Sequence, residues 1–187
     1  MFRLPVDATL DLVLLEPPHA PMLFALVDAN RAHLRRYLPW VDGTLGPADS
    51  AQFIAASLEQ FARGQAVQVG ILSGGVLAGH CGTHAINWHQ RRTGLGYWLG
   101  KDHQGQGLMT RAVRALATHA FTALGLHRLE IQAATDNVRS RAVAERVGFA
   151  YEGTARGAEW LHDRWADHAN YAMLAEDWPP KPGTTPR

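Results

Sequence analysis

His103-Gln104-Gly105-Gln106-Gly107-Leu108-Met109-Thr110 is the stretch that decides the fold of this chain of 187 residues. It follows a strand-like run, Gly96-Tyr97-Trp98-Leu99, and begins a helix whose apolar residues recur at helical spacing as far as Leu124. Two glycines one residue apart allow a tight turn and direct successive N–H groups toward one place. The first turn of the helix adds unpaired N–H groups and the positive end of the helix dipole. The stretch therefore predicts an anion site, most favourably for the phosphates of a large cofactor.

Two other functional interpretations of a glycine-rich turn fail here. A dinucleotide fold requires Gly-x-Gly-x-x-Gly after a first strand, but Thr110 occupies the third glycine position and the motif lies past the middle of the chain. A phosphate-binding P-loop requires Gly-Lys-Ser/Thr, and no lysine follows these glycines. By itself, the turn does not distinguish a structural role from a functional one.

The composition indicates an ordinary globular domain. Hydrophobic residues make up 47% of the chain and charged residues 19%, and the length suits one domain. We expect a single domain over residues 1–178 and a Pro-rich, disordered tail over 179–187. The net charge of +1 gives no reason to expect a nucleic-acid or membrane partner.

Cysteine and histidine usage argues against a metal site and against a disulfide. Cys81 is the only cysteine, which excludes an internal disulfide, and a core thiol is favoured over a nucleophile. Ten histidines are present, but no His-x-x-x-His or Glu-x-x-His pair falls on a credible helix face, so no metal is expected. His162, Asp163, Asp167 and His168 gather near the last predicted hairpin, where surface turn chemistry is the favoured explanation.

No targeting segment is evident in the sequence. Residues 1–15 lack a cationic region followed by an apolar core, so no signal peptide is expected. No apolar run approaches the ~20 residues that a membrane-spanning helix needs. We therefore expect a cytoplasmic protein.

Periodicity and turn residues predict a mixed order of strands and helices with no repeat and no linker. Caps and breaks are expected at Asn30, at Asp136 or Asn137, at Gly125 and at Gly148. The expected strands are 10–15, 67–72, 76–86, 93–99, 128–134, 149–160 and 165–174, and the expected helices are 19–38 with an interruption, 47–63, 107–124 and 137–147.

This order and its motifs resemble the GNAT family of acyl-CoA-dependent N-acyltransferases, most closely the ribosomal-protein N-terminal acetyltransferases of the RimJ/RimL kind. The resemblance covers nearly the whole chain and is most specific from about 94 to 175. Met109 stands where the general family usually has Gly or Ala, but the RimL-like branch accepts Met there. The stretches that carry the resemblance are Gly96–Leu99, His103–Thr110, Asp136–Ala144, Gly148-Phe149 and Glu159-Trp160-Leu161.

The resemblance implies an α/β (α+β) GNAT fold, a mixed, mostly antiparallel sheet with splayed central strands flanked by helices. The strand ending at Trp98 and Leu99 would splay from the strand at 131–134, and pantetheine would insert there like a missing strand. An N–H near Leu99 would then hydrogen-bond the thioester carbonyl. Asn137 would bond the pantetheine arm, or it simply caps a helix. The backbone amides expected to hold the coenzyme A pyrophosphate are those of Gln104, Gly105, Gln106, Gly107, Leu108, Met109 and Thr110.

The resemblance also implies the chemistry, a direct attack of a neutral amine on an acetyl thioester. An α-amine of pKa ~8 needs only modest help to lose its proton. Glu159 occupies the position of the general base, and Ser140 that of the acid that protonates the departing thiolate. The alternatives are a solvent-exposed carboxylate at a hairpin end for Glu159 and an ordinary first-turn helix serine for Ser140.

Acetyl transfer to the N-terminal α-amine of a protein, foremost a ribosomal protein, is the function that the resemblance implies. Two alternatives stay open: a small-molecule amine as the acceptor, such as an antibiotic, polyamine or amino acid, and a coenzyme A-binding regulator without catalysis. Tyr37, Trp40 and Trp88 are candidates to line an acceptor groove, although such aromatics also cover cores at loop edges. A homodimer is compatible with the composition, but the sequence does not indicate which residues would form its interface.

Overall fold

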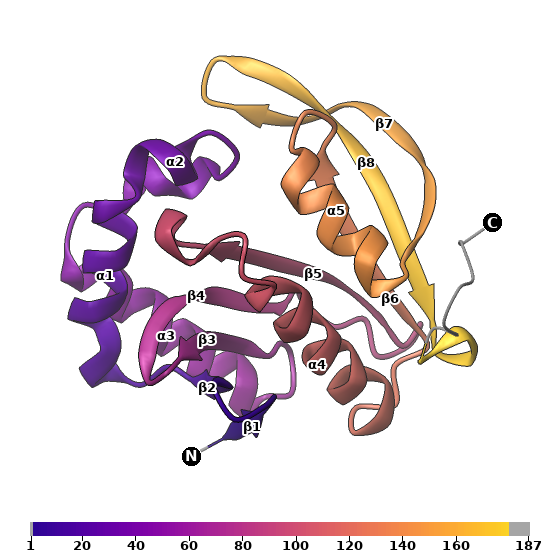
Figure 1. The fold of residues 1–187 in the computed structure, drawn as a ribbon, viewed down its shortest axis with the longest axis horizontal. Helices are drawn as coiled ribbons and strands as arrows, with labels where there is room; N and C mark the ends of the chain where they lie inside the picture. The colour runs from indigo at the N-terminus through magenta and orange to yellow at the C-terminus, as the bar shows by residue number, and fades with distance from the viewer. Residues whose placement is uncertain (1, 180–187) are drawn as a thin grey trace.

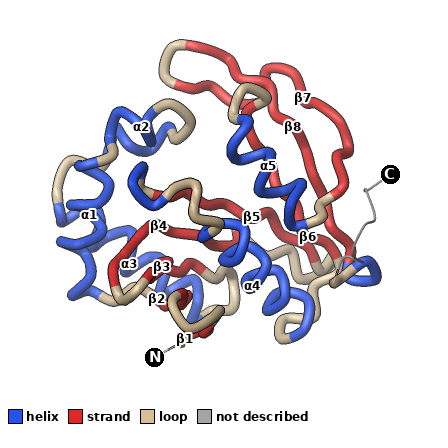
Figure 2. The backbone as a smooth tube through the Cα atoms, in the orientation of Figure 1, coloured by secondary structure: helices blue, strands red, loops and turns tan. Residues whose placement is uncertain are grey.

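The computed structural model describes residues 2–179, which form one eight-stranded sheet with helices on its faces (Figures 1 and 2). The strand order is β1-β2-β3-β4-β5-β6-β8-β7, and every neighbouring pair is antiparallel except β5–β6. The expected mixed, mostly antiparallel sheet is confirmed. The strands are β1 (Arg3–Pro5), β2 (Leu10–Leu14), β3 (Gln68–Ser73), β4 (Val76–Thr83), β5 (Arg92–Leu99), β6 (Arg128–Ala134), β7 (Ala150–Leu161) and β8 (Arg164–Leu174).

Two groups of helices cover the sheet. In Figure 1, α4 and α5 lie in front of it, while α3 lies behind it. Helix α1 packs on α3 through a cluster that includes Leu23 and Ile54. The α-helices are α1 (Ala20–Ala29), α2 (Arg31–Arg35), α3 (Pro47–Ala62), α4 (Leu108–Thr122) and α5 (Val138–Val147).

Helix α4 supplies the largest apolar contribution to the core. Its side chains recur at helical spacing, so that one stripe faces the sheet and the opposite face meets solvent. Burial of each large side chain stabilises the fold by about 1.5–3 kcal/mol. The helix is followed by Gly125 with φ +64, a backbone conformation that glycine adopts without strain. The buried residues of α4 are Leu108, Met109, Ala112, Val113, Leu116, Ala117 and Ala120.

The central strands separate at their C-terminal ends. Parallel pairing between β5 and β6 runs only from Arg92↔Arg128 to Leu95↔Ile131. Beyond this point, β5 stays paired with β4 as far as Leu99, and β6 stays paired with β8 as far as Ala134. The expected splay is thus present, and α4 and α5 begin close to its open end because each follows one of the two strands.

Some boundaries differ from the sequence expectation. The edge strand β1 was not expected, because three residues are too short to show alternation, and it is held by pairing with β2. The strand expected over 76–86 ends at Thr83, and residues Pro39–Gly43, between two expected helices, form a 3-10 helix. The expected disordered tail over 179–187 lies outside the described residues except for Pro179. Among the helices that the structure describes, none is long and apolar enough to cross a bilayer.

Candidate active site

The turn before α4 presents a row of free backbone amides. Gly105 has φ +76 and Gly107 has φ +71, so both positions require a left-handed backbone. Within residues 2–179, the N–H groups of Gly105 to Thr110 have no hydrogen-bond acceptor. The N–H of Gln104, in contrast, donates to the carbonyl oxygen of Lys101 at 3.2 Å. The anion site therefore comprises residues 105–110, and the amide of Gln104 is already used.

Gln104 contributes through its side chain. Its Oε1 accepts a hydrogen bond from Arg139, and its Nε2 lies 2.8 Å from Nε2 of His33. Burial lowers the pKa of His33, and the charges of Arg139 and Lys101 lower it further. A neutral His33 can accept the Gln104 N–H, so this side chain is fixed between an imidazole and a guanidinium.

Cationic side chains from α5 lie beside the anion site. Arg139 contacts Gln104, and Nε of Arg146 donates to Oγ1 of Thr110 at 3.3 Å. The sequence reasoning missed both arginines, although their spacing of seven puts them on one helix face. The side chains of Leu108 and Met109 are buried, so only their backbone amides are offered to a ligand. This arrangement fits the diphosphate of a nucleotide cofactor.

Strand β5 offers further backbone groups to the gap between the central strands. The N–H of Gly100 donates to the carbonyl oxygen of Ala78 at 2.9 Å, and bonded and non-bonded pairs alternate along an antiparallel ladder. The His80↔Trp98 pair is accordingly bonded, whereas Tyr97 and Leu99 direct their N–H and carbonyl groups away from β4. These groups face the splay, as insertion of an extended cofactor arm would require.

A cavity of about 1120 Å³ lies beside the splay and reaches it at Tyr97, Asn137 and Ser140. Its floor includes the glycines at 82, 94 and 96, and the side chains of Gln68 and His84 lie over these positions. Neither lysine nor arginine is among the described residues that line it. Aromatic and acidic side chains on its walls are Tyr37, Trp40, Asp49, Phe53, Tyr97, Trp98, Glu130 and Glu159. Such a surface suits a cationic amine.

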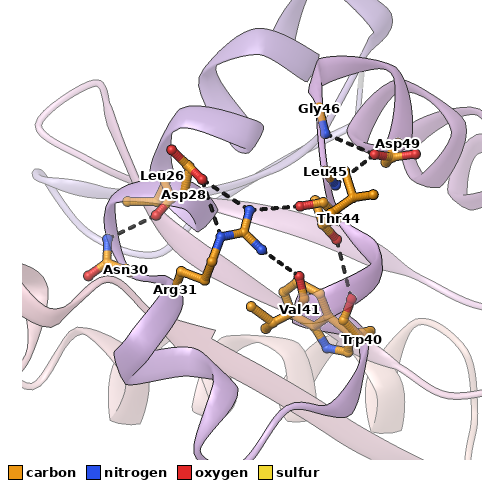
Figure 3. Close-up of polar contacts among 10 residues, drawn as sticks. All are labelled: Leu26, Asp28, Asn30, Arg31, Trp40, Val41, Thr44, Leu45, Gly46 and Asp49. Atoms are coloured by element: carbon orange, nitrogen blue, oxygen red, sulfur yellow. Dashed lines mark hydrogen bonds and ion pairs between the residues drawn. The ribbon is translucent and has the colours of Figure 1, made fainter.

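The loop that carries Trp40 is held in place by Arg31. Figure 3 shows the guanidinium of Arg31 donating to the carbonyl oxygens of Val41, at 2.7 Å, and Thr44, at 2.8 Å. The Trp40 ring packs against Trp98, with centroids 6.0 Å apart. This part of the cavity wall is therefore tied to α2 and to β5 together.

Of the three aromatic residues expected to line an acceptor groove, two line the cavity and one does not. Tyr37 and Trp40 line the cavity, and the Tyr37 hydroxyl donates to the carbonyl oxygen of Asp136 at 3.1 Å. The expectation for Trp88 is wrong. Its Nε1 donates to the carbonyl oxygen of Gly64 at 2.8 Å, and the residue lies outside the cavity lining.

Glu159 lies in the cavity, beside a histidine. Its side chain is 35% exposed, and Oε2 lies 3.1 Å from Nε2 of His168, whose side chain is 14% exposed. Surface turn chemistry is thus wrong for His168, because this residue lies within β8 and faces the cavity. His162 and Asp163, in contrast, lie in the turn between β7 and β8 as expected, and the His162 side chain is 12% exposed and contacts Asp42 at 3.2 Å.

Ser140 lies on the first turn of α5, against Tyr97 of β5. The Ser140 hydroxyl donates to Oη of Tyr97 at 3.3 Å, and the tyrosine hydroxyl donates to the Ser140 carbonyl at 3.1 Å. Burial raises the pKa of Tyr97 to about 12. The side chain of Asn137 accepts the Ser140 N–H at 3.2 Å, so it caps α5 and also lines the cavity. Sequence reasoning named Ser140 and Asn137 but missed Tyr97 as a polar partner.

Two further side chains with polar atoms are buried on β4. Cys81 is fully buried, and burial raises its pKa to about 12, so the expectation of a core thiol is confirmed. His80 is 8% exposed, and its Nε2 has no partner in the described chain. No group of three or more metal-ligating side chains occurs among the residues that the structure describes.

Comparison with known proteins gives a consistent picture. Residues 9–150 match the model of the acetyltransferase (GNAT) domain family. A putative ribosomal N-acetyltransferase, YdaF, of Bacillus subtilis (strain 168) is 34% identical over 95% of this chain and 98% of its own length. The ribosomal-protein-serine acetyltransferase of Escherichia coli (strain K12) is 30% identical over 91% of this chain and 96% of its own. The solved structure of RimL, a ribosomal L7/L12 α-N-protein acetyltransferase in complex with coenzyme A, superposes with a TM-score of 0.90 at 31% identity, covering 92% of this chain and 98% of RimL.

Proposed function

Because this chain belongs to the GNAT family of acetyltransferases and is an acetyl-CoA-dependent N-acetyltransferase, we propose that it acetylates the N-terminal α-amine of a protein, foremost a ribosomal protein. The observation that carries this proposal is the cavity that meets the splayed strands. The cavity offers a surface that suits an amine acceptor. It also adjoins the end of β5, whose free backbone groups can hold a thioester. A ribosomal acceptor implies that the reaction takes place in the cytoplasm.

The donor side uses backbone groups. In this proposal, the amides of 105–110 hold the pyrophosphate of acetyl-CoA, and the free backbone groups of Tyr97 and Leu99 hold its pantetheine arm. The N–H of Leu99 hydrogen-bonds the thioester carbonyl, which stabilises the negative charge that develops there. The Nδ2 of Asn137 contacts the pantetheine arm while Oδ1 caps α5. Acetyl-CoA supplies the activated acyl group.

The acceptor side requires a proton acceptor and a proton donor. Glu159 takes a proton from the α-ammonium group, whose pKa of ~8 lies close to the working pH. Ser140 donates its hydroxyl proton to the departing thiolate, which replaces Tyr97 Oη as the acceptor, and Tyr97 holds Ser140 in place through its hydrogen bond to the Ser140 carbonyl. Both side chains line the same cavity, which supports their acting on one reacting centre.

Three observations favour a peptide N-terminus as the acceptor. The cavity is larger than one side chain requires, the described residues that line it include no lysine or arginine that would repel an ammonium group, and its walls are aromatic. In addition, two of the similar proteins are named as acetyltransferases of ribosomal proteins. A peptide with a free α-amine fits the size, the charge and the aromatic walls of the cavity.

Acetyl-CoA turnover with a panel of amines tests this proposal. The panel holds peptides copying ribosomal N-termini, the same peptides with a blocked α-amine and one internal lysine, and polyamines, aminoglycosides and free amino acids. We expect turnover only with a free peptide α-amine. Turnover confined to a small amine would show that the acceptor is that amine and not a protein. Coenzyme A binding without turnover on any amine would indicate a regulator.

A further inference from the structure

Glu159 owes its position to an irregularity in β7. Ala155 lies opposite His168, and Glu159 lies opposite Ala166, so four steps along β7 face only two steps along β8. Gly157, within this bulge, has φ +57, and its N–H donates to Oδ1 of Asp167 at 2.7 Å. Without the two extra residues, position 157 would face Ala166. The bulge therefore delivers a carboxylate to a place that regular pairing would give to a glycine.

The bulge also brings Glu159 closer to His168, on the sheet face that the two residues share. Residues directly opposite each other share a face, and so do residues two apart along a strand. On both sides, His168 is opposite an alanine, Ala134 on β6 and Ala155 on β7. These small neighbours leave room for the imidazole to lie against the carboxylate, at an Nε2 to Oε2 distance of 3.1 Å.

The two carboxylate oxygens of Glu159 differ in their hydrogen bonding. Oε2 is held by His168, while Oε1 has no hydrogen-bond partner among residues 2–179. An ionised carboxylate can only accept, so Nε2 of His168 carries the proton in this contact. The bond to a charged group restricts the rotation of a carboxylate that is 35% exposed.

From this geometry we propose that His168 is a positioning residue, which fixes Oε2 of Glu159 and leaves Oε1 free to take the proton of the acceptor amine. The inference rests on the proposed function, because it assumes that Glu159 is the general base. His168 itself does not contact the reacting atoms. It acts through the carboxylate by keeping the productive orientation populated before the amine arrives.

Three substitutions of histidine test this role. His168→Leu removes the donor and keeps an apolar side chain, and it should lower kcat by about tenfold while the KM values for acetyl-CoA and peptide change by less than about twofold. His168→Gln places an amide N–H at a comparable reach and should restore most of kcat. His89→Leu, at an exposed histidine outside the cavity, is the matched control and should behave like the wild type. Thermal unfolding of each variant checks that it is folded.

A double-mutant cycle separates this inference from the proposed function. In a Glu159→Gln background, His168→Leu should cause no further loss of kcat, since the basic carboxylate that His168 positions is gone. Nitrogen NMR of the imidazole, without substrate, should show Nε2 of His168 protonated in the wild type and altered in Glu159→Gln. If the wild type turns over and His168→Leu keeps its kcat, or His168→Gln fails to restore activity, the positioning role is wrong. If the wild type has no turnover while NMR shows the Glu159-dependent proton, the proposed function fails instead.

Discussion

Ser140 and Tyr97 are joined by a reciprocal pair of hydrogen bonds between α5 and β5. The serine hydroxyl donates to the tyrosine oxygen at 3.3 Å, and the tyrosine hydroxyl donates to the Ser140 carbonyl at 3.1 Å. Because burial raises the pKa of Tyr97 to about 12, the phenol stays protonated at any working pH. Two hydroxyl groups thus lie at the splay, and mutation can tell which of them donates the proton.

Replacement of each hydroxyl separates a proton donor from its orienting partner. Ser140→Ala should lower kcat on the order of a hundredfold, because general acid catalysis is lost. Tyr97→Phe keeps the ring and should lower kcat by only about tenfold, because it disturbs the orientation of Ser140. Steady-state kinetics on both variants checks this. The assignment to Ser140 is wrong if Ser140→Ala keeps its rate and Tyr97→Phe loses it.

Glu159→Gln tests the general base. The amide is nearly the same size as the carboxylate but cannot take a proton, so kcat should fall by about a hundredfold or more. Coenzyme A affinity, measured by calorimetry, should stay within about twofold because the anion site is built from other residues. The pH dependence of kcat should change as well. An unchanged rate and pH profile would remove Glu159 from this role.

Two glycines at opposite ends of α4 provide a matched test of the anion site. Gly107 has φ +71 and Gly125 has φ +64, and at both positions the space that a Cβ would occupy is open. Alanine at either position should destabilise the fold by about 1 kcal/mol, since both need a left-handed backbone. Only Gly107→Ala should weaken coenzyme A binding, by about tenfold, as it shifts the amides of 105–110. Equal affinity in both variants would contradict the proposed pyrophosphate site.

The buried imidazole of His80 should make stability depend on pH. Burial lowers its pKa in the folded protein to about 4, whereas an unfolded histidine titrates near ~6.5. As the pH falls from about 6.5 toward 4, the unfolded chain takes up a proton that the folded protein does not. The free energy of unfolding should therefore be fully retained above this window and fall across it, by about 3 kcal/mol.

Urea unfolding at a series of pH values measures this effect. His80→Leu should flatten the slope between pH 4 and 6.5, and His89→Leu, on the surface, should keep the wild-type slope. Because His33 and His119 also have lowered pKa values from burial, only the difference between variant and wild type is informative. The same slope in His80→Leu and the wild type would show that His80 does not titrate in this way.

Elements with a strong local signal could be predicted from the sequence. The apolar stripe of α4 and its terminal Gly125 specify a helix that needs no distant partner to be recognised. Strand β6 covers the expected residues 128–134, and Asn137 caps α5 as one of the two candidates. In each case the information lies within a few neighbouring residues.

Features that depend on distant pairing could not be predicted in this way. Strand β1 exists because β2 lies beside it, and Trp88 bonds to Gly64, which is remote in sequence. His168 lies within the expected strand 165–174, but its contact with Glu159 depends on the bulge at Gly157 of β7, which the sequence of β8 does not indicate. Candidate site residues were found through the resemblance to a family, whereas their partners came from the three-dimensional arrangement.

The central claim is that this enzyme acetylates the N-terminus of a ribosomal protein, and intact-mass spectrometry of ribosomal proteins tests it most directly. Ribosomes from cells with and without this gene are compared, and a third strain carries the Glu159→Gln form. We expect one ribosomal protein to lose a single N-terminal acetyl group in both the deletion strain and the Glu159→Gln strain. Identical masses for every ribosomal protein in all three strains would contradict the claim.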